Sequence, residues 1–367
     1  MEDTFLNPHG GNIYKASEIY GFEKDAFLDY SANINPLGIP EALKKIIFAD
    51  LDNISKYPDP YCTSLRSDIS EYLKISEDNI IIGNGASEVI FLLFDVLKPK
   101  RVVIPAPSFS EYAKAVKSCG AEIKYFQIKE ADGFRLNVDE LLESIEEEDD
   151  CVILCNPNNP TSKLVPKPDL LRLLKESGQK GLNVIIDEAF IELTEAGSSN
   201  SMLEFIKEYP NLFIIRAFTK LFAIPGLRLG YGIGNYELVR EMWEKKTPWS
   251  VNSLASSVGE FLKTSEDYLN RTSEWLIREK EWFYNELKKI IGLKVFKPET
   301  NFVLIKITDN HITSEFLREA LARKGVLIRN AANFMFLDNK FFRVAVKDRE
   351  RNMKFLKLLW EVMEKEE

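Results

Sequence analysis

The residue with the clearest chemical potential is a lysine in an apolar setting. Lys220 follows an apolar, strand-like run, and its neighbours include Phe218, Leu221 and Phe222. Burial disfavours the charged form of an amine and so makes it a better nucleophile for Schiff-base formation. Taken alone, a lysine beside aromatic residues is more often a surface charge whose stem packs on the rings. The motif therefore predicts a nucleophilic amine only in combination with other groups.

A carboxylate at the end of a strand is the second such group. Asp187 ends the apolar run Asn183–Asp187. There it could pair with a protonated ring nitrogen and keep a cofactor electron-withdrawing. Alternatively, Asp187 could be a helix cap or a Mg²⁺ ligand. The second alternative arises because a strand that ends in two acidic residues, here Asp187 and Glu188, is also typical of phosphate-binding-loop nucleotidases. The sequence contains no G-x-x-x-x-G-K-[ST] motif, so a Mg²⁺-dependent nucleotidase is a distant alternative.

Two turns add polar groups after strand-like runs. In the turn Gly83–Glu88, glycines let the backbone approach a ligand, and the free amides of Ala86 and Ser87 at a helix N-terminus could bind phosphate. In the turn Cys155–Thr161, two Asn-Pro pairs fix the backbone and could aim an amide side chain, such as that of Asn159, at the sheet edge. Each turn alone is weak evidence, since tight strand-to-helix turns are common.

These groups require a scaffold that brings strand ends together. Short apolar runs alternate with amphipathic stretches, which is typical of βα units. The runs are Asn79–Ile82, Arg101–Pro105, Cys151–Cys155, Asn183–Asp187, Leu212–Arg216 and Arg228–Ile233. Helices are predicted between them, for example Ser87–Leu97 and Asp139–Glu148, with the acidic run 146–150 as a solvated helix end. We therefore expect an α/β fold with a largely parallel sheet whose ligands lie beyond the strand C-termini.

The two ends of the chain differ from this pattern. A long amphipathic segment, Leu254–Ile291, predicts a spine helix broken near Thr264, and a small α+β domain follows it. The first fifty residues show little regular pattern and are predicted to form an arm that packs on the small domain. The expected organisation is an arm (1–50), a large cofactor-binding domain (51–250), and a spine helix with a small C-terminal domain (251–367).

The composition narrows the classes of function. The 367 residues carry a net charge of −9, which argues against nucleic-acid or anionic-membrane partners, so an anionic ligand must be held by local arginines. Four cysteines do not form a disulfide framework, and two histidines are too few for a histidine-based metal site. We expect reduced cysteines and no metal. Without a secretory signal or an apolar run of membrane-spanning length, a cytoplasmic location is expected.

The order of the motifs identifies a family resemblance. The phosphate turn, Tyr112 after the next strand, the Asn-Pro-Thr loop, Asp187 and the Lys220...Arg228 pair occur as in the fold-type I pyridoxal-phosphate (PLP) enzymes. The resemblance spans essentially the whole chain and is closest to the histidinol-phosphate aminotransferase branch. It implies a mostly parallel, seven-stranded sheet between helices, plus a small α+β domain.

Within that branch the sequence looks most like the decarboxylases that act on O-phospho-L-threonine in cobalamin biosynthesis. Five motifs indicate this: His9–Asn12, Asp29–Gly38, Asp187–Phe190, Ala223–Arg228 and Pro248–Asn252. The resemblance implies decarboxylation to 1-amino-2-propanol O-phosphate, with histidinol-phosphate transamination as the first alternative. Histidinol-phosphate aminotransferases usually have a tyrosine donor where this chain has Phe190.

The resemblance also implies cofactor contacts. Lys220 would carry PLP as a Schiff base, with Thr219 beside it, and Asp187 would pair with the ring nitrogen. Asn159 would bond the 3′-oxygen, and Tyr112 would stack on the ring.

The resemblance also implies contacts to the cofactor phosphate, and the chain differs from the family at two positions. Ala86, Ser87 and Arg228 would hold the cofactor phosphate, and Tyr57 would reach it from the neighbouring subunit of a homodimer. The family often has Ser where this chain has Ala217, and Gly where it has Ser162. The first departure removes an expected phosphate contact.

On the substrate side, two arginines match family positions. Arg343 would bind the substrate carboxylate and Arg329 the substrate phosphate, since the guanidinium fork suits both groups. His9, Asn12 and Asn33 are expected to line the substrate side, with His9 as a second phosphate donor or, alternatively, a structural arm residue.

Overall fold

A seven-stranded sheet forms the centre of the larger part of the molecule in the computed structural model, which describes residues 10–364. Its strand order is β2-β8-β7-β6-β5-β3-β4. The strands are β2 (Ile80–Asn84), β3 (Arg101–Ala106), β4 (Glu122–Gln127), β5 (Cys151–Cys155), β6 (Asn183–Asp187), β7 (Leu212–Ala217) and β8 (Leu229–Ile233). Strand β8 runs antiparallel to both of its neighbours, β2 and β7, and the other neighbouring pairs are parallel. The expected α/β fold with a mostly parallel sheet is confirmed.

The sequence prediction missed β4 for a physical reason. Strand β5 is buried at every position, as in a strand covered on both faces. Strand β4 pairs only with β3 at the sheet edge and has no fully buried residue. Its polar and charged residues, including Glu122 and Lys124, therefore hide the apolar run that marked the other strands.

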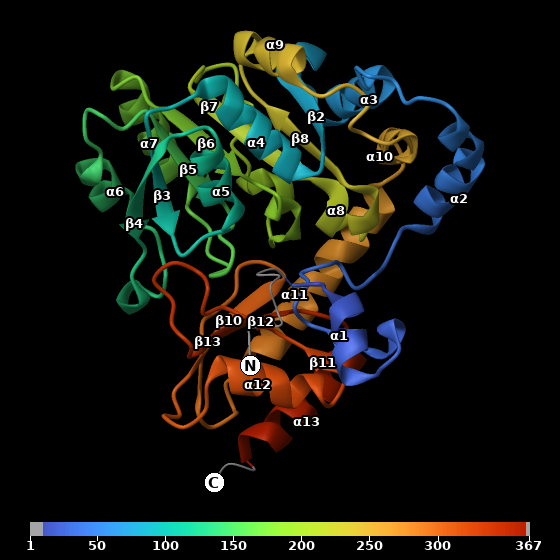
Figure 1. Cartoon of the computed structure of the whole chain (residues 1–367), viewed down its shortest axis with the longest axis vertical. Helices are drawn as coiled ribbons and strands as arrows, with labels where there is room; N and C mark the ends of the chain where they lie inside the picture. Colours follow the sequence, from blue (N-terminus) through green and yellow to red (C-terminus); the bar gives the residue numbers. More distant parts are fainter. Residues whose placement is uncertain (1–9, 365–367) are drawn as a thin grey trace.

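Helices cover both faces of this sheet (Figure 1). Because side chains alternate along a strand, each strand contributes to two separate cores. One core packs under α4 (Ala86–Leu97), α5 (Glu111–Ser118) and α9 (Tyr236–Lys245). The other packs under α3 (Thr63–Leu73), α6 (Val138–Ser144), α7 (Lys167–Gln179) and α10 (Ser257–Leu262).

The acidic run after α6 differs from its prediction. The helix ends at Ser144, and Asp149 is buried rather than solvated. Its carboxylate accepts hydrogen bonds from Arg101 Nε at 2.5 Å and Lys124 Nζ at 3.1 Å. The run therefore anchors the edge of the sheet through ion pairs.

A four-stranded antiparallel sheet forms the smaller part, with the order β12-β13-β10-β9. Its strands are β9 (Leu293–Val295), β10 (Phe302–Ile307), β12 (Arg329–Asn330) and β13 (Phe341–Ala345), accompanied by α12 (Ser314–Ala322) and α13 (Arg349–Glu364). The long helix α11 (Glu266–Leu287) leads into it from the large part. Since α10 ends at Leu262, the predicted break near Thr264 is confirmed.

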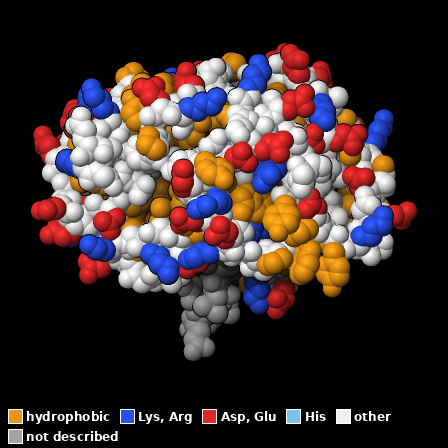
Figure 2. All heavy atoms as spheres, turned by 90° about the horizontal axis from the view of Figure 1, so that it is seen from above, with side chains coloured by type: hydrophobic (Ala, Val, Ile, Leu, Met, Phe, Trp, Pro, Cys, Tyr) orange, Lys and Arg blue, Asp and Glu red, His pale blue; other side chains and the backbone are white. Residues whose placement is uncertain are grey.

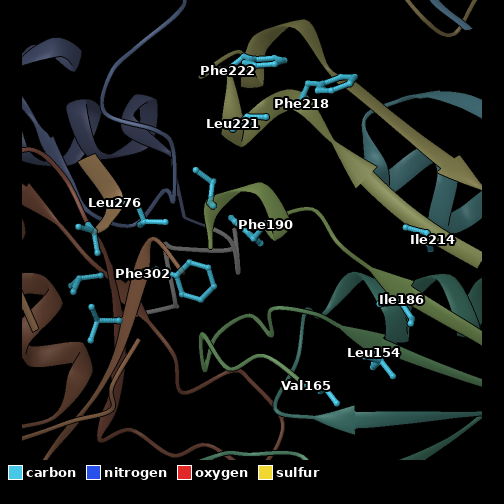
Figure 3. Close-up of a cluster of buried hydrophobic side chains, with 14 of the residues drawn as sticks. Leu154, Val165, Ile186, Phe190, Ile214, Phe218, Leu221, Phe222, Leu276 and Phe302 are labelled. Carbon is cyan, nitrogen blue, oxygen red and sulfur yellow. The ribbon is translucent and has the colours of Figure 1, made fainter. Parts of the chain in front are cut away.

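Apolar side chains connect the two parts. Figure 3 shows Phe190, which follows β6, directed toward Phe302 of β10. Their ring centroids lie 5.1 Å apart in an edge-to-face arrangement. Edge-to-face pairs of buried rings stabilise such contacts beyond the area they bury.

The N-terminal segment is more regular than predicted. It contains α1 (Ile13–Tyr20), β1 (Leu28–Asp29) and α2 (Glu41–Ala49). Strand β1 pairs in parallel with β11 (Val326–Leu327) of the small part, whereas α2 packs on α10. The boundaries at residues 50 and 250 stay predictions. Between residues 10 and 364, no helix is both long and apolar enough to cross a membrane.

Candidate active site

A cavity of about 440 Å³ lies beyond the C-terminal ends of β5, β6 and β7, between the two parts. Residues of the large part, the small part and the N-terminal segment line it together. They are Gly10, Ser31, Ala32, Asn33, Gly85, Ala86, Ser87, Phe109, Ser110, Glu111, Tyr112, Cys155, Asn159, Asp187, Ala189, Phe190, Ala217, Thr219, Lys220, Arg228, Arg329, Phe334 and Arg343. The cavity lies where a parallel sheet is expected to hold a ligand.

Lys220 enters the cavity from the short helix α8 (Phe218–Leu221), directly after β7. The stacked rings of Phe218 and Phe222 flank it in the chain and fix the helix in the core. Burial, and then the nearby charges of Arg343 and Arg228, lower the pKa of Lys220 to about 8. No residue between 10 and 364 accepts a hydrogen bond from its amine. Such an amine is prepared to lose its proton and act as a nucleophile.

Asp187 and Tyr112 form a buried pair on the floor of the cavity. The Tyr112 hydroxyl donates to Asp187 Oδ2 at 2.6 Å, and the Ala189 amide donates to Oδ1 at 2.9 Å. Burial raises the pKa of Asp187, although the two hydrogen bonds oppose this effect. Among the described residues, no basic side chain pairs with this carboxylate. It is therefore available to a cationic N–H group of a ligand.

The turn before α4 forms a cradle for an anion. Gly85 has φ of 82°, and a Cβ added to it would lie 2.5 Å from Arg228 Nη2. A Cβ on Gly230 would lie 2.2 Å from the Ala86 amide nitrogen. The two glycines therefore let Arg228 and the N-terminus of α4 converge. The amides of Ala86 and Ser87 begin the helix, where N–H groups favour phosphate.

Two arginines of the small part face these groups. Arg343 on β13 and Arg329 on β12 are cross-strand neighbours. Arg343 donates through Nη1 to Asn159 Oδ1 and through Nη2 to the Ser31 carbonyl at 2.7 Å, whereas its buried Nε finds no partner in residues 10–364. Arg329 donates to Asn333 Oδ1 at 2.7 Å and lies over the Phe334 ring. Burial lowers both pKa values, but a guanidinium remains charged at neutral pH.

Asn33 offers the cavity an acceptor. Its side chain is buried, and its Oδ1 has no hydrogen-bond partner among the described residues. Its backbone carbonyl accepts a hydrogen bond from Asn301 Nδ2 at 3.1 Å, which holds the segment in place. Because an unpaired buried acceptor is unfavourable, this atom is suited to a donor on a ligand.

The predicted residues are not all in the cavity. Eleven of them line it, namely Asn33, Ala86, Ser87, Tyr112, Asn159, Asp187, Thr219, Lys220, Arg228, Arg329 and Arg343. Asn12 instead caps α1 by accepting from the Lys15 amide at 3.1 Å. His9 lies outside the described residues.

Tyr57 lies away from the cavity on the surface. It is 84% exposed, and its ring lies 5.2 Å from that of Trp249. Phe48, Leu51 and Ile54 are also exposed large hydrophobic residues of this segment. In Figure 2, exposed apolar side chains gather toward the side of the molecule that carries α2 and α10.

The cavity residues that sequence reasoning did not single out include Ser31 and Phe334. Ser31 lies within the motif Asp29–Gly38, which could have pointed to it, whereas Phe334 carries no local signal. In the described part of the chain, no group of three or more His, Cys, Asp or Glu side chains could hold a metal. The four cysteines are free, as predicted.

Comparison with known proteins gives a consistent result. The model of the aminotransferase class I and II family matches residues 26–359. A threonine-phosphate decarboxylase of Salmonella typhimurium is 35% identical, over 98% of this chain and 97% of its own. A relative from Caldanaerobacter subterraneus subsp. tengcongensis, 41% identical over 96% of this chain and 92% of its own, carries the same enzyme name provisionally. The fold is similar to the crystal structure of the histidinol-phosphate aminotransferase from Clostridium acetobutylicum, with a TM-score of 0.85 and 37% sequence identity. The match covers 92% of this chain and 99% of that one.

Proposed function

The chain belongs to the aminotransferase class I and II family of PLP-dependent enzymes, and from that premise we propose that it decarboxylates O-phospho-L-threonine. The products would be CO₂ and 1-amino-2-propanol O-phosphate, for cobalamin side-chain synthesis. One observation carries the proposal: two guanidinium groups, of Arg343 and Arg329, line the same cavity as the amine of Lys220. A substrate with one carboxylate and one phosphate matches that pair. The two decarboxylase-named relatives support the choice of substrate.

The residues of the large part fit PLP. The amine of Lys220 has no hydrogen-bond acceptor within residues 10–364, and the Asp187 carboxylate has no cationic partner there. Lys220 would hold the cofactor covalently, and Asp187 would hold a proton on its ring nitrogen. As the resemblance implies, Thr219 would lie beside the cofactor, Tyr112 would stack on its ring and Asn159 would bond the 3′-oxygen.

The anion cradle would hold the cofactor phosphate through Ala86, Ser87 and Arg228. Ala217 contributes no hydroxyl to this cradle, so the amides and Arg228 carry more of the contact. Bound there, PLP supplies an electron sink for the pair left on Cα when a bond to Cα breaks.

The substrate side would select which bond breaks. Arg343 would bind the carboxylate with its unpaired Nε, Arg329 would bind the phosphate, and Asn33 Oδ1 would accept a hydrogen bond from the substrate. These contacts would orient the substrate so that the Cα–carboxylate bond is the one that breaks, CO₂ leaves and Cα takes up a proton. Phe190 packs on Phe302 and has no hydroxyl to donate to the cofactor.

The test is a product assay. PLP-loaded enzyme is incubated with O-phospho-L-threonine without any 2-oxo acid, and CO₂ and 1-amino-2-propanol O-phosphate are quantified. Equal amounts of both over many turnovers are expected. The absence of CO₂ contradicts the proposal.

A second candidate is histidinol-phosphate transamination, which the likeness to the Clostridium acetobutylicum aminotransferase favours. This reaction needs an amino acceptor, whereas decarboxylation does not. Turnover of histidinol phosphate that depends on added 2-oxoglutarate, without CO₂ from phosphothreonine, would establish it.

We further propose that the enzyme is a homodimer in which Tyr57 reaches the cofactor phosphate of the partner subunit. The exposure of Tyr57 and of its apolar neighbours supports this proposal, because large exposed apolar patches mark interaction surfaces. Mixing and re-forming dimers of inactive Tyr57→Ala and Lys220→Ala enzymes would give mixed dimers with one intact site. Recovered activity is expected, and none would contradict the shared site.

We also propose a cytoplasmic location. Reduced cysteines are typical of that compartment, and all four cysteines are free here. Fractionation of cells that express the chain at its native level tests this, with recovery outside the cytoplasmic fraction as the contradicting result.

A further inference from the structure

A serine of the large part holds the segment that leads into β10. Ser162 lies in the turn after Asn159 and is fully buried. Its hydroxyl accepts hydrogen bonds from the amides of Glu299 at 3.0 Å and Thr300 at 2.9 Å. Its carbonyl accepts a further contact from the Glu299 amide at 3.1 Å. One residue of the large part therefore engages two consecutive amides just before β10.

Neighbouring contacts fix the same segment. Lys163 Nζ donates to the Lys297 carbonyl at 2.6 Å. The Leu164 amide donates to Glu299 Oε2 at 2.7 Å, and Thr300 Oγ1 donates to the Leu193 carbonyl at 2.8 Å. The segment 297–300 is thus attached to two separate loops of the large part.

The backbone conformation of Ser162 is unfavourable for a residue with a side chain. Its φ is 65°, in the left-handed region that glycine adopts more easily than any other residue. Glycine is also the residue that the family resemblance leads one to expect here. A glycine would relieve the backbone and keep the carbonyl contact to the Glu299 amide, but it would lose both hydroxyl contacts, including the one that the Thr300 amide makes. The hydroxyl offsets an unfavourable conformation with contacts between the two parts.

These contacts close a ring that includes Arg343. The segment 297–300 leads into β10, and Leu304 of β10 pairs with Arg343 of β13. Arg343 in turn donates to Asn159, in the same turn as Ser162. The turn therefore holds the arginine directly through Asn159 and indirectly through β10.

We propose that Ser162 is a positioning residue, which fixes β10 and β13 against the large part so that Arg343 stands ready for the substrate carboxylate. Preorganisation of this kind strengthens binding because less freedom is lost when the ligand arrives. The identity of that carboxylate rests on the proposed function, whereas the attachment of segment 297–300 does not.

The test compares Ser162→Gly with the wild type in the PLP-loaded enzyme. Hydrogen exchange at the Thr300 amide should become about tenfold faster, since its hydrogen bond to the Ser162 hydroxyl is lost. Exchange at the Glu299 amide should change less, because the carbonyl of residue 162 still accepts from it. KM for phosphothreonine should rise by about the same factor while kcat changes much less, because substrate binding is what weakens. The absorbance spectrum of the bound cofactor should stay unchanged.

Lys98→Gly is the matched control. Lys98 also has a positive φ, of 44°, but it is exposed at the end of α4. This glycine substitution should leave exchange at residues 299 and 300, KM and kcat unchanged.

Two results would overturn the proposal. Unchanged exchange in Ser162→Gly would exclude the attachment, and faster exchange with unchanged KM would exclude the positioning of Arg343. If Ser162→Gly does not fold, Ser162→Ala removes the same hydroxyl and must give the same exchange and KM effects. If phosphothreonine is not a substrate, faster exchange still supports the attachment, and the KM comparison is made with the substrate that is turned over.

Discussion

The large-part wall and the small-part wall of the cavity are built in different ways. In the large part, Lys220 and Asp187 follow directly from the ends of neighbouring parallel strands, β7 and β6. In the small part, Arg343 reaches its position through contacts with Ser31 of the N-terminal segment and Asn159 of the large part. The first wall depends on one sheet, and the second depends on how three segments of the chain meet.

This difference suggests a division of labour. The large-part wall, which strand ends fix, holds the residues for the cofactor chemistry in constant positions. The small-part wall depends on contacts between parts, so small substitutions at those contacts can change the position of its arginines. Substitutions in the first wall should therefore remove catalysis, and substitutions in the second should mainly weaken substrate binding.

The largest expected effect is that of Lys220→Ala. Loss of the amine should lower kcat by more than about 10⁴-fold, since it removes the covalent attachment and a proton carrier at once. Borohydride reduction followed by mass spectrometry should find the cofactor on the peptide that contains residue 220 in the wild type and on no peptide in the variant. A labelled peptide elsewhere would refute the assignment.

The next prediction distinguishes the role of Asp187 from that of the adjacent Glu188. Asp187→Asn should lower kcat about 10²- to 10⁴-fold by removing the partner of the ring nitrogen. Because burial raises the pKa of Asp187, its charge is unfavourable in the cofactor-free chain at neutral pH. The variant should therefore keep or increase the free energy of unfolding in urea.

Glu188→Gln is the matched control for that variant. Glu188 is buried and accepts two hydrogen bonds from Arg216, each at 3.0 Å. Removing its charge leaves Glu192 as the carboxylate partner of the buried Arg216 and should lower the free energy of unfolding by about 1–3 kcal/mol. If Asp187→Asn destabilised the chain as much, both carboxylates would be structural.

Substitutions in the small-part wall should mainly affect substrate binding. Arg343→Lys keeps the charge but loses the guanidinium fork, so KM for phosphothreonine should rise about 10- to 100-fold with a smaller change in kcat. Arg329→Gln should raise KM for phosphothreonine to a similar extent, but it should leave any turnover of unphosphorylated threonine unchanged. A loss that is equal for both substrates would show that Arg329 does not bind phosphate.

The smallest expected effect couples the two walls through charge. Since the pKa of Lys220 is lowered to about 8, the rate at which PLP attaches to the cofactor-free enzyme should rise with pH, with a midpoint near 8. Arg343 contributes to that lowering, so Arg343→Gln should move the midpoint to higher pH. A midpoint near 10.5 in the wild type would mean that the amine is solvated.

The same difference explains what the sequence could predict. Lys220, Asp187 and the Gly83–Glu88 turn lie beside apolar runs, so local patterns were sufficient to predict their strands and place them at one sheet edge. Helix α1 was missed because it is only eight residues long, and its capping by Asn12 and Gly21 carries little apolar pattern.

Long-range contacts could not be predicted in this way. Ser31 and Arg343 are 312 residues apart in the chain, and their hydrogen bond depends on how the parts pack. Phe334 lies over the Arg329 guanidinium only because the chain after β12 turns back on it. The arginines and Asn159 were predicted from the family resemblance, whereas the contacts that hold the arginines emerged only from the fold.

The bond that breaks at Cα is the central claim, and proton NMR of a phosphothreonine reaction in D₂O tests it most directly. We predict 1-amino-2-propanol O-phosphate with one deuterium at C1, while unreacted phosphothreonine retains its Cα proton. Loss of the Cα proton from the substrate, without formation of that product, would contradict the account and indicate that the Cα–H bond breaks instead.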